Sequence, residues 1–209
     1  MAELVTNLAQ LFAAMLATIG AGMMFYKYQL QTYLLLTGFF GAFMLGTLHW
    51  TLHYYLFSYT PQIFYVSELA WIASHIFLLT LTYTLADSDE KRFRHPALWF
   101  APVFCLSQLM LYLSHADVLL NTLISILVLA IMWVSLRGFL YARRQTGKPR
   151  DRQYFHLALL AIIVLEHGLW TSSCFWMGDT FKNPYFWFDS LLTVALLLLL
   201  PATRKAVAS

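Results

Sequence analysis

The sequence predicts an all-α integral membrane protein, a bundle of seven transmembrane helices with its N-terminus outside the cell and its C-terminus in the cytoplasm. Of the 209 residues, 60% are hydrophobic and only 11% are charged, whereas about a quarter of a soluble domain is charged. Seven apolar stretches approach the roughly 20 residues that a membrane-spanning helix needs. The basic residues lie almost entirely in every second connection between them, that is, on one side. The lipid bilayer is therefore the expected surroundings, and no nucleic-acid partner is expected.

The seven spans follow one another with mostly short connections, so consecutive helices are expected to pack as antiparallel neighbours. They are expected at Leu4–Phe25, Thr32–Phe57, Ile63–Leu85, Pro96–Ser114, Val118–Tyr141, Tyr154–Met177 and Pro184–Ala202. The segment Met1–Asn7 has no Lys or Arg and contains Glu3, which is unlike a signal peptide. The first span is therefore expected to be retained, and residues 1–209 are expected to form a single transmembrane domain.

The basic residues set the predicted orientation. With seven spans, twelve of the thirteen Lys and Arg residues fall on one side, and only Lys182 falls on the other. Short cytoplasmic loops carry the excess of basic residues, which places that side in the cytoplasm of a cell-membrane protein. The longer loops Ala86–His95 and Ala142–Gln153 are expected to be solvated connectors. Contact with anionic lipid or with a membrane or cytoplasmic protein partner is the alternative.

A pseudo-repeat of three helices, a linker helix and three helices is also predicted. An aromatic pair precedes Glu68 and another precedes Asp189, each about one turn before the carboxylate. The halves would be residues 1–95 and 118–209, with Pro96–Ser114 between them. In topology and length the chain resembles the SWEET and PQ-loop transporters, the KDEL receptors and, more remotely, the opsins. It lacks a PQ motif, and its last span has no lysine for retinal, so no functional residue is carried over.

Ionisable side chains at membrane depth are the candidate functional residues. Burying them in lipid is unfavourable, so their presence there by default marks a functional site. Depth along each helix follows from a rise of about 1.5 Å per residue. By that measure the candidates lie in the outer half of the bundle or near its middle. The histidines and carboxylates expected to converge on one outward-facing cavity are His49, His53, Glu68, His75, Glu166, His167 and Asp189. Aromatic residues that include Trp71 and Trp170 are expected at its rim.

Three functions are compatible with this pattern. Carboxylates without intramembrane Lys or Arg partners, set among Trp and Tyr, suit a small ligand, above all a cation. A membrane-embedded receptor, sensor or carrier would use Glu68, Trp71, His75, Glu166, Trp170, Asp189 and His49 as ligand-binding residues. The third function is haem or quinone binding by histidine pairs across helices, and a purely structural subunit of a membrane complex is the remaining alternative.

The second function is a zinc-dependent intramembrane hydrolase acting on a lipid. His49 and His53 are four residues apart on one helix face, and His75 could complete a zinc site. Seven-helix hydrolases of the ceramidase and adiponectin-receptor type use histidine ligands in this way. The two cysteines, Cys105 and Cys174, are isolated and form neither a disulfide framework nor a thiolate metal pattern.

Overall fold

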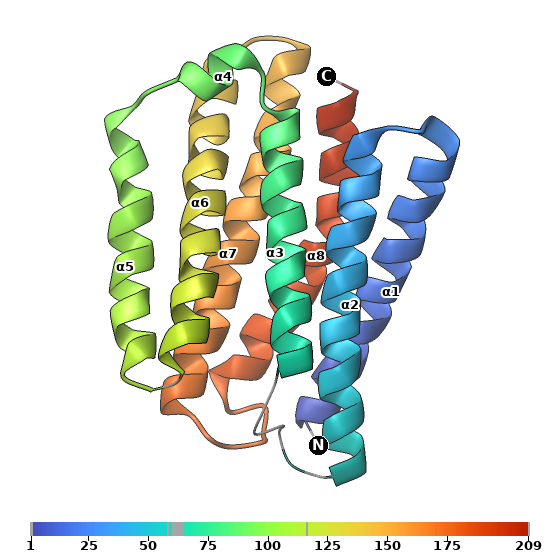
Figure 1. Ribbon diagram of the computed structural model, residues 1–209, viewed down its shortest axis with the longest axis vertical. Coiled ribbons are helices and arrows are strands. Elements are labelled where there is room, and N and C mark those ends of the chain that lie inside the picture. Colours follow the sequence, from blue (N-terminus) through green and yellow to red (C-terminus); the bar gives the residue numbers. More distant parts are fainter. Residues whose placement is uncertain (1, 58, 60–64, 116, 209) are drawn as a thin grey trace.

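The computed structural model describes residues 2–57, 59, 65–115 and 117–208, and within these residues it contains helices and no strands (Figure 1). Seven helices or helical segments are long and apolar enough to cross a membrane, which confirms the all-helical fold class and supports a multi-pass membrane protein. The long helices are α1 (Ala2–Tyr28), α2 (Gln31–Phe57), α3 (Tyr65–Leu85), α5 (Phe100–Leu113), α6 (Val118–Ala142), α7 (Arg152–Phe175) and α8 (Pro184–Val207). Short 3-10 turns, η1 (Pro96–Trp99) and η2 (Lys148–Asp151), precede α5 and α7.

The helix ends differ from the expected ones where local chemistry decides them. Helix α7 ends at Phe175, because Trp176 is already extended. Helix α8 runs on to Val207 and contains Pro201 within it. The expected start of the third span at Ile63 lies outside the described residues.

One helix was not predicted at all. The short helix α4 (Ser88–Arg92) lies within the loop that was expected to be a solvated connector. The Asp87 side chain caps it by accepting from the backbone N–H of Glu90 at 2.8 Å, a bond that satisfies one of the free donors of the first turn.

Six of the seven long helices form a closed ring, in the order α1, α2, α3, α6, α7, α8 and back to α1. The contacts between α3 and α6 and between α8 and α1 join the first three helices to the last three. Helix α5 lies outside this ring and packs against α6 and α7 (Figure 1). This arrangement is compatible with a linker helix between two halves, and the pseudo-repeat itself stays a prediction.

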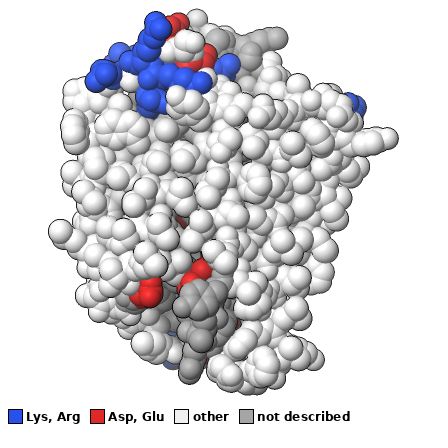
Figure 2. Space-filling model, in the orientation of Figure 1, with Lys and Arg blue, Asp and Glu red and all other residues white. Residues whose placement is uncertain are grey.

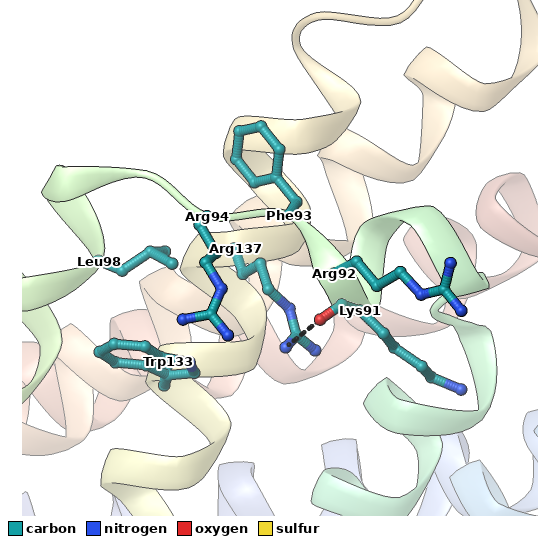
Figure 3. Close-up of a pocket in the computed structure, with 7 residues that line it drawn as sticks. All are labelled: Lys91, Arg92, Phe93, Arg94, Leu98, Trp133 and Arg137. Carbon is teal, nitrogen blue, oxygen red and sulfur yellow. Dashed lines mark hydrogen bonds between the residues drawn. The ribbon is translucent and has the colours of Figure 1, made fainter.

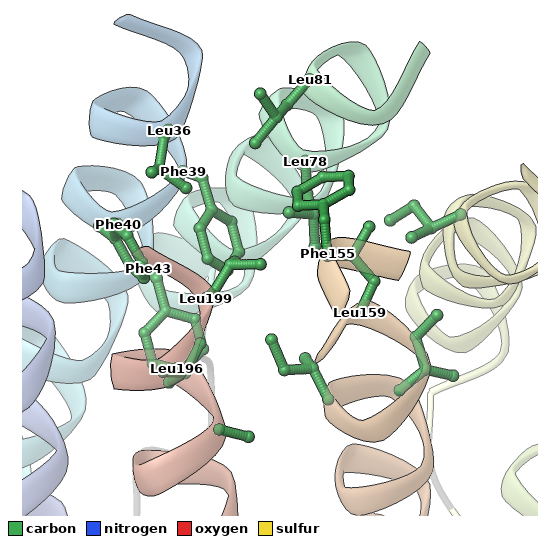
Figure 4. Packing of buried hydrophobic residues seen from close by; sticks show 14 of the residues in the cluster. Leu36, Phe39, Phe40, Phe43, Leu78, Leu81, Phe155, Leu159, Leu196 and Leu199 are labelled. Carbon is green, nitrogen blue, oxygen red and sulfur yellow. The ribbon is translucent and has the colours of Figure 1, made fainter. Parts of the chain in front are cut away.

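The core fills the interior of this ring with aliphatic and phenyl side chains (Figure 4). It is formed by residues that include Phe40 of α2, Leu81 of α3, Phe155 of α7 and Leu199 of α8, all fully buried. Large apolar side chains also cover the outside of the bundle, among them Val103 and Met110 on α5, Leu119 on α6 and Leu69 on α3. An apolar exterior of this extent fits hydrocarbon rather than water.

The Lys and Arg side chains gather at one end of the molecule, which we call the basic end. It is the end at which α1, α3, α6 and α8 finish and where α4 lies (Figure 1). Lys and Arg side chains cluster there, over α4, and a broad and largely uncharged band follows below (Figure 2). The predicted segregation of the basic residues is therefore present in the fold.

Candidate functional site

A histidine and a glutamate meet between α3 and α7, away from the basic end. The Nε2 atom of His75 lies 3.4 Å from Oε2 of Glu166, and the two side chains are 10% and 14% exposed. The other ring nitrogen of His75, Nδ1, is 2.8 Å from the carbonyl oxygen of Trp71. A carbonyl oxygen only accepts hydrogen bonds, so Nδ1 carries a hydrogen and Nε2 faces the carboxylate.

This geometry leaves one proton to be shared between His75 and Glu166. Either Nε2 is protonated beside a carboxylate, or neutral imidazole accepts from the carboxylic acid. Both arrangements keep the pair neutral as a whole.

Three indole rings lie beside this pair. Trp71 is one helical turn from His75, and its ring meets Trp170 of α7 edge to face at 6.4 Å and Trp50 of α2 at 5.9 Å. Helix α2 can approach Trp71 of α3 closely because residue 46 is a glycine. A Cβ on Gly46 would lie 2.6 Å from Nε1 of Trp71. Within the described chain, that buried N–H has no hydrogen-bond partner.

The two histidines of α2 make contacts of their own. His49 Nδ1 lies 2.8 Å from the hydroxyl of Ser67, and His53 Nδ1 lies 3.2 Å from the carbonyl oxygen of Tyr59 beyond the end of α2. Their ring centroids are 6.4 Å apart, as expected for positions i and i+4. Among the described residues, no group of three or more His, Cys, Asp or Glu side chains is placed to hold a metal ion. The zinc set of His49, His53 and His75 stays a prediction.

Asp189 and His167 make further separate contacts. Asp189 of α8 is buried and accepts a hydrogen bond from Nε2 of Gln10 at 2.6 Å, which ties α8 to α1. The His167 ring packs against Phe104 of α5 at 5.0 Å, and the Tyr112 hydroxyl donates to the His167 carbonyl at 3.1 Å. His167 therefore faces the outlying helix α5.

Glu68 lies on the same helix face as Trp71 and His75, nearer the start of α3. It is partly exposed, and Asp117 at the start of α6 is its like-charged neighbour. The structure thus distributes the residues expected in one cavity over several contacts. The largest group of predicted site residues that lie together is the His75–Glu166 pair with Trp71 and Trp170.

A second histidine–carboxylate pair, not predicted from the sequence, lies at the basic end. Nε2 of His156 on α7 is 3.5 Å from Oε1 of Glu90 on α4, and each side chain is only 1% exposed. Gly138 of α6 makes room for both, because a Cβ there would lie 2.2 Å from the His156 ring and 2.6 Å from Oε1 of Glu90. The expectation that the loop Ala86–His95 is a solvated connector is therefore wrong for Glu90, which seals α4 against the bundle.

Burial also changes the acidity of this carboxyl group. Desolvation above all, together with the neighbouring Asp87 carboxylate, raises the pKa of Glu90 from its ordinary value of 4.5 to about 7. The positive charges of Arg152, Arg137 and Lys91 act in the opposite direction. Glu90 therefore changes its charge near neutral pH.

Two features of the sequence could have pointed to this second pair. Asp87 and Glu90 have the spacing of a capping box, which marks the start of a helix, and Gly138 interrupts an otherwise apolar span, which is typical of close packing. Neither feature says which charged residue of the loop turns inward.

Comparisons with protein-family models, with curated proteins and with solved structures gave no match. The function is therefore inferred from the contacts described above.

Proposed function

We propose that this protein is a membrane-embedded receptor or carrier for a small organic cation, which binds at the carboxylate of Glu166. The observation that carries the proposal is the 3.4 Å contact between His75 and Glu166, on two helices that are far apart in the sequence. No Lys or Arg neutralises this carboxylate within the membrane-spanning part of α3 or α7. Its charge is instead balanced by a proton that can leave.

The chemistry of binding is an exchange of one cation for another. A ligand cation beside Glu166 takes over the role of the shared proton, which then leaves the pair. The indole faces of Trp71 and Trp170, which meet edge to face next to the pair, add cation–π attraction in a place with little water. A ligand with a quaternary or protonated amine meets both requirements.

The site faces the outside of the cell in this proposal. The basic end lies in the cytoplasm, because basic residues are retained on that side of a membrane, and the N-terminus is then outside. In a chain with Cys105 and Cys174 changed to alanine, we expect Gln145→Cys to be labelled only after permeabilisation. Thr180→Cys should be labelled from outside in intact cells. The reverse pattern would place the site on the cytoplasmic side.

Binding is tested directly with choline and tetramethylammonium as probes. Tryptophan fluorescence of the purified protein should change on titration, and calorimetry in two buffers of different ionisation enthalpy should detect release of about one proton per cation bound. Binding should weaken as the pH is lowered, because protons compete with the cation for the carboxylate.

Glu166→Gln is the decisive variant, since it removes the charge and keeps the shape. It should abolish probe binding while the protein remains folded. Asp117→Asn is the matched control, because it removes an acidic charge from the start of α6 and asparagine also serves as a helix cap. Probe binding that persists in Glu166→Gln would refute the proposal.

The zinc hypothesis has a separate test. If His49 and His53 hold Zn²⁺, protein purified without chelator should contain about one metal ion per chain, and the double change to alanine should remove it. Metal well below that amount would leave no basis for a hydrolase.

A further inference from the structure

A pocket of about 410 Å³ lies at the basic end, between α4, η1 and α6 (Figure 3). Four of its lining residues are basic, namely Lys91, Arg92, Arg94 and Arg137. No acidic side chain is among the described residues that line it. The pocket therefore has a strongly positive potential, which attracts anions.

Two basic neighbours of these cations form ion pairs, whereas the four cations of the pocket form none with the residues that the structure describes. Arg152 pairs with Asp87 at 3.0 Å and Lys205 pairs with Asp151 at 3.1 Å. Within the described part of the chain, none of the four pocket cations forms an ion pair. The pocket thus brings together four cations that have no carboxylate partner among the described residues.

Among the four, Arg137 is the one with buried donor atoms that lack hydrogen-bond partners in the described residues. Its Nη1 donates to the Lys91 carbonyl oxygen at 3.2 Å, but its Nε and Nη2 atoms are buried and have no hydrogen-bond partner among the described residues. The charge of Glu90 acts on Arg137, yet burial leaves that carboxyl only partly ionised at neutral pH. A guanidinium buried without full compensation is unfavourable, so an anion that bonds to it is favoured.

The side chains divide the pocket into a binding side and an outer side. In Figure 3 the guanidinium group of Arg94 lies beside Trp133, and that of Arg137 lies between Arg94 and the Lys91 carbonyl oxygen, whereas the Lys91 and Arg92 side chains extend away from Trp133. The Lys91 ammonium lies over the ring of Tyr83 instead, 4.3 Å from its centroid. Arg94 and Arg137 are therefore the two groups placed to bind one anion together.

The rest of the lining is apolar and continues to the outer surface of the bundle through Trp99. Leu98 is buried, and Trp133 meets Trp99 edge to face at 6.1 Å. Trp99 in turn is 69% exposed on the outside of the bundle. Tryptophan is typical of the level at which headgroups meet acyl chains, so the pocket lies where an anion would be attached to an apolar body.

We propose that this pocket binds the headgroup phosphate of an anionic phospholipid. The guanidinium groups of Arg94 and Arg137 donate hydrogen bonds to the phosphate oxygens, an arrangement that arginine favours over lysine. Trp133 and Leu98 contact the glycerol and the first carbons of the acyl chains. This site is independent of the cation site proposed above and lies at the other end of the bundle.

The test measures lipid binding to the full chain in detergent, by native mass spectrometry and by the unfolding midpoint. Phosphatidylglycerol should bind and raise the midpoint, and phosphatidylcholine should do so far less. Arg94→Gln should weaken phosphatidylglycerol binding about tenfold or more, as expected for a lost charge-assisted hydrogen bond. Arg94 is exposed, so this variant should fold.

Arg143→Gln is the matched control, because Arg143 is an exposed arginine at the same end whose guanidinium lies over the Phe139 ring and outside the pocket lining. It should bind phosphatidylglycerol as the parent does. Arg137→Lys keeps the charge but loses the planar fork, and should bind more weakly than the parent.

Three outcomes would overturn the proposal. Equal binding of the two lipids would show no preference for anionic headgroups. An equal loss in Arg94→Gln and Arg143→Gln would show general attraction to the basic end. Binding of inorganic phosphate that depends on Arg94, without a preference for phosphatidylglycerol, would assign the pocket to a free anion.

Discussion

The bundle holds two histidine–glutamate pairs, and they are built differently. His75 and Glu166 come from two long membrane-spanning helices and keep 10% and 14% of their side-chain surface exposed. His156 also comes from a long helix, but Glu90 comes from the short helix α4, and both of these side chains are 1% exposed. The first pair keeps part of its surface exposed, whereas the second is sealed inside the protein.

The surroundings of the two histidines lead to the same distinction. Nδ1 of His75 donates to the Trp71 carbonyl, which fixes the ring and turns Nε2 toward the carboxylate. Nδ1 of His156 is buried without a hydrogen-bond partner in the described residues. Contacts between a histidine and a glutamate can thus differ within one bundle in exposure and in hydrogen bonding, because Oε1 of Glu90 is also buried without a hydrogen-bond partner in the described residues. The two pairs differ in side-chain exposure and in whether Nδ1 of the histidine has a hydrogen-bond partner.

The largest effect is expected from Gly138→Ala, which attacks the sealed pair. Its Cβ would lie 2.2 Å from the His156 ring and 2.6 Å from Oε1 of Glu90, so both side chains must move in a packed interior. We expect unfolding to become easier by about 1–3 kcal/mol, measured as the thermal midpoint in detergent. Gly41→Ala is the control, because the nearest atom to its Cβ would be 3.8 Å away, and it should be neutral or stabilising.

The apolar runs of the sequence predicted seven spans because the length and hydropathy of a transmembrane helix leave few alternatives. Helix ends were harder, because they depend on single residues such as the extended Trp176 and the tolerated Pro201. The basic residues were predicted to gather on one side, and they do so over α4 (Figure 2). Span number and charge placement are properties of composition, whereas helix ends are properties of local backbone contacts.

The next prediction uses pH to separate the two pairs. Burial raises the pKa of Glu90 to about 7, above its value in the unfolded chain, so the folded state favours the protonated form. The stability that this provides is complete below about pH 4.5 and is lost as the pH rises through 7. Glu90→Gln imitates the protonated form. It should match the parent near pH 4 and exceed its stability by up to about 3 kcal/mol near pH 8, because the shift from 4.5 to about 7 is worth about 1.4 kcal/mol per pKa unit.

Asp89→Asn controls for the loss of an acidic charge from α4, since Asp89 is exposed and Glu90 is buried. Its unfolding midpoint should follow that of the parent at every pH. If Glu90→Gln also follows the parent across this range, then Glu90 is not titrating in the folded protein. The pair at the basic end would then be a fixed contact without any response to pH.

A smaller change in stability, with a clear change in binding, is expected from Gly46→Ala. The added Cβ would lie 2.6 Å from Nε1 and 2.8 Å from Cδ1 of Trp71, but Trp71 is only partly buried and its ring can shift. Unfolding should therefore change by less than about 1 kcal/mol, while choline binding should weaken. Gly41→Ala, on the same helix, should leave choline binding unchanged. Equal binding in both variants would place the ligand away from Trp71.

The sequence pointed to the residues of the more exposed pair, His75 and Glu166, and missed Glu90 of the sealed pair for a physical reason. His75 and Glu166 are ionisable residues inside apolar runs, where any charge stands out. Glu90 belongs to the run Ser88-Asp89-Glu90-Lys91-Arg92, where charge is ordinary and only tertiary contact selects the residue that turns inward. The pairing of His75 with Glu166 could not be derived either, since it depends on how α3 and α7 are rotated about their axes.

The smallest effect is expected from Glu68→Gln, and it decides how far the cation site extends. Glu68 shares a helix face with Trp71 and His75, which is why the sequence places it in the site. In the structure it is partly exposed, and Asp117 is its like-charged neighbour. Removing its charge relieves a repulsion and removes a distant attraction for a cation. Stability should stay within about 0.5 kcal/mol of the parent, and choline affinity should fall by less than about threefold, since surface charges contribute little. A loss as large as that of Glu166→Gln would show that the ligand contacts both carboxylates, and the site would then extend outward along α3 as the sequence predicts.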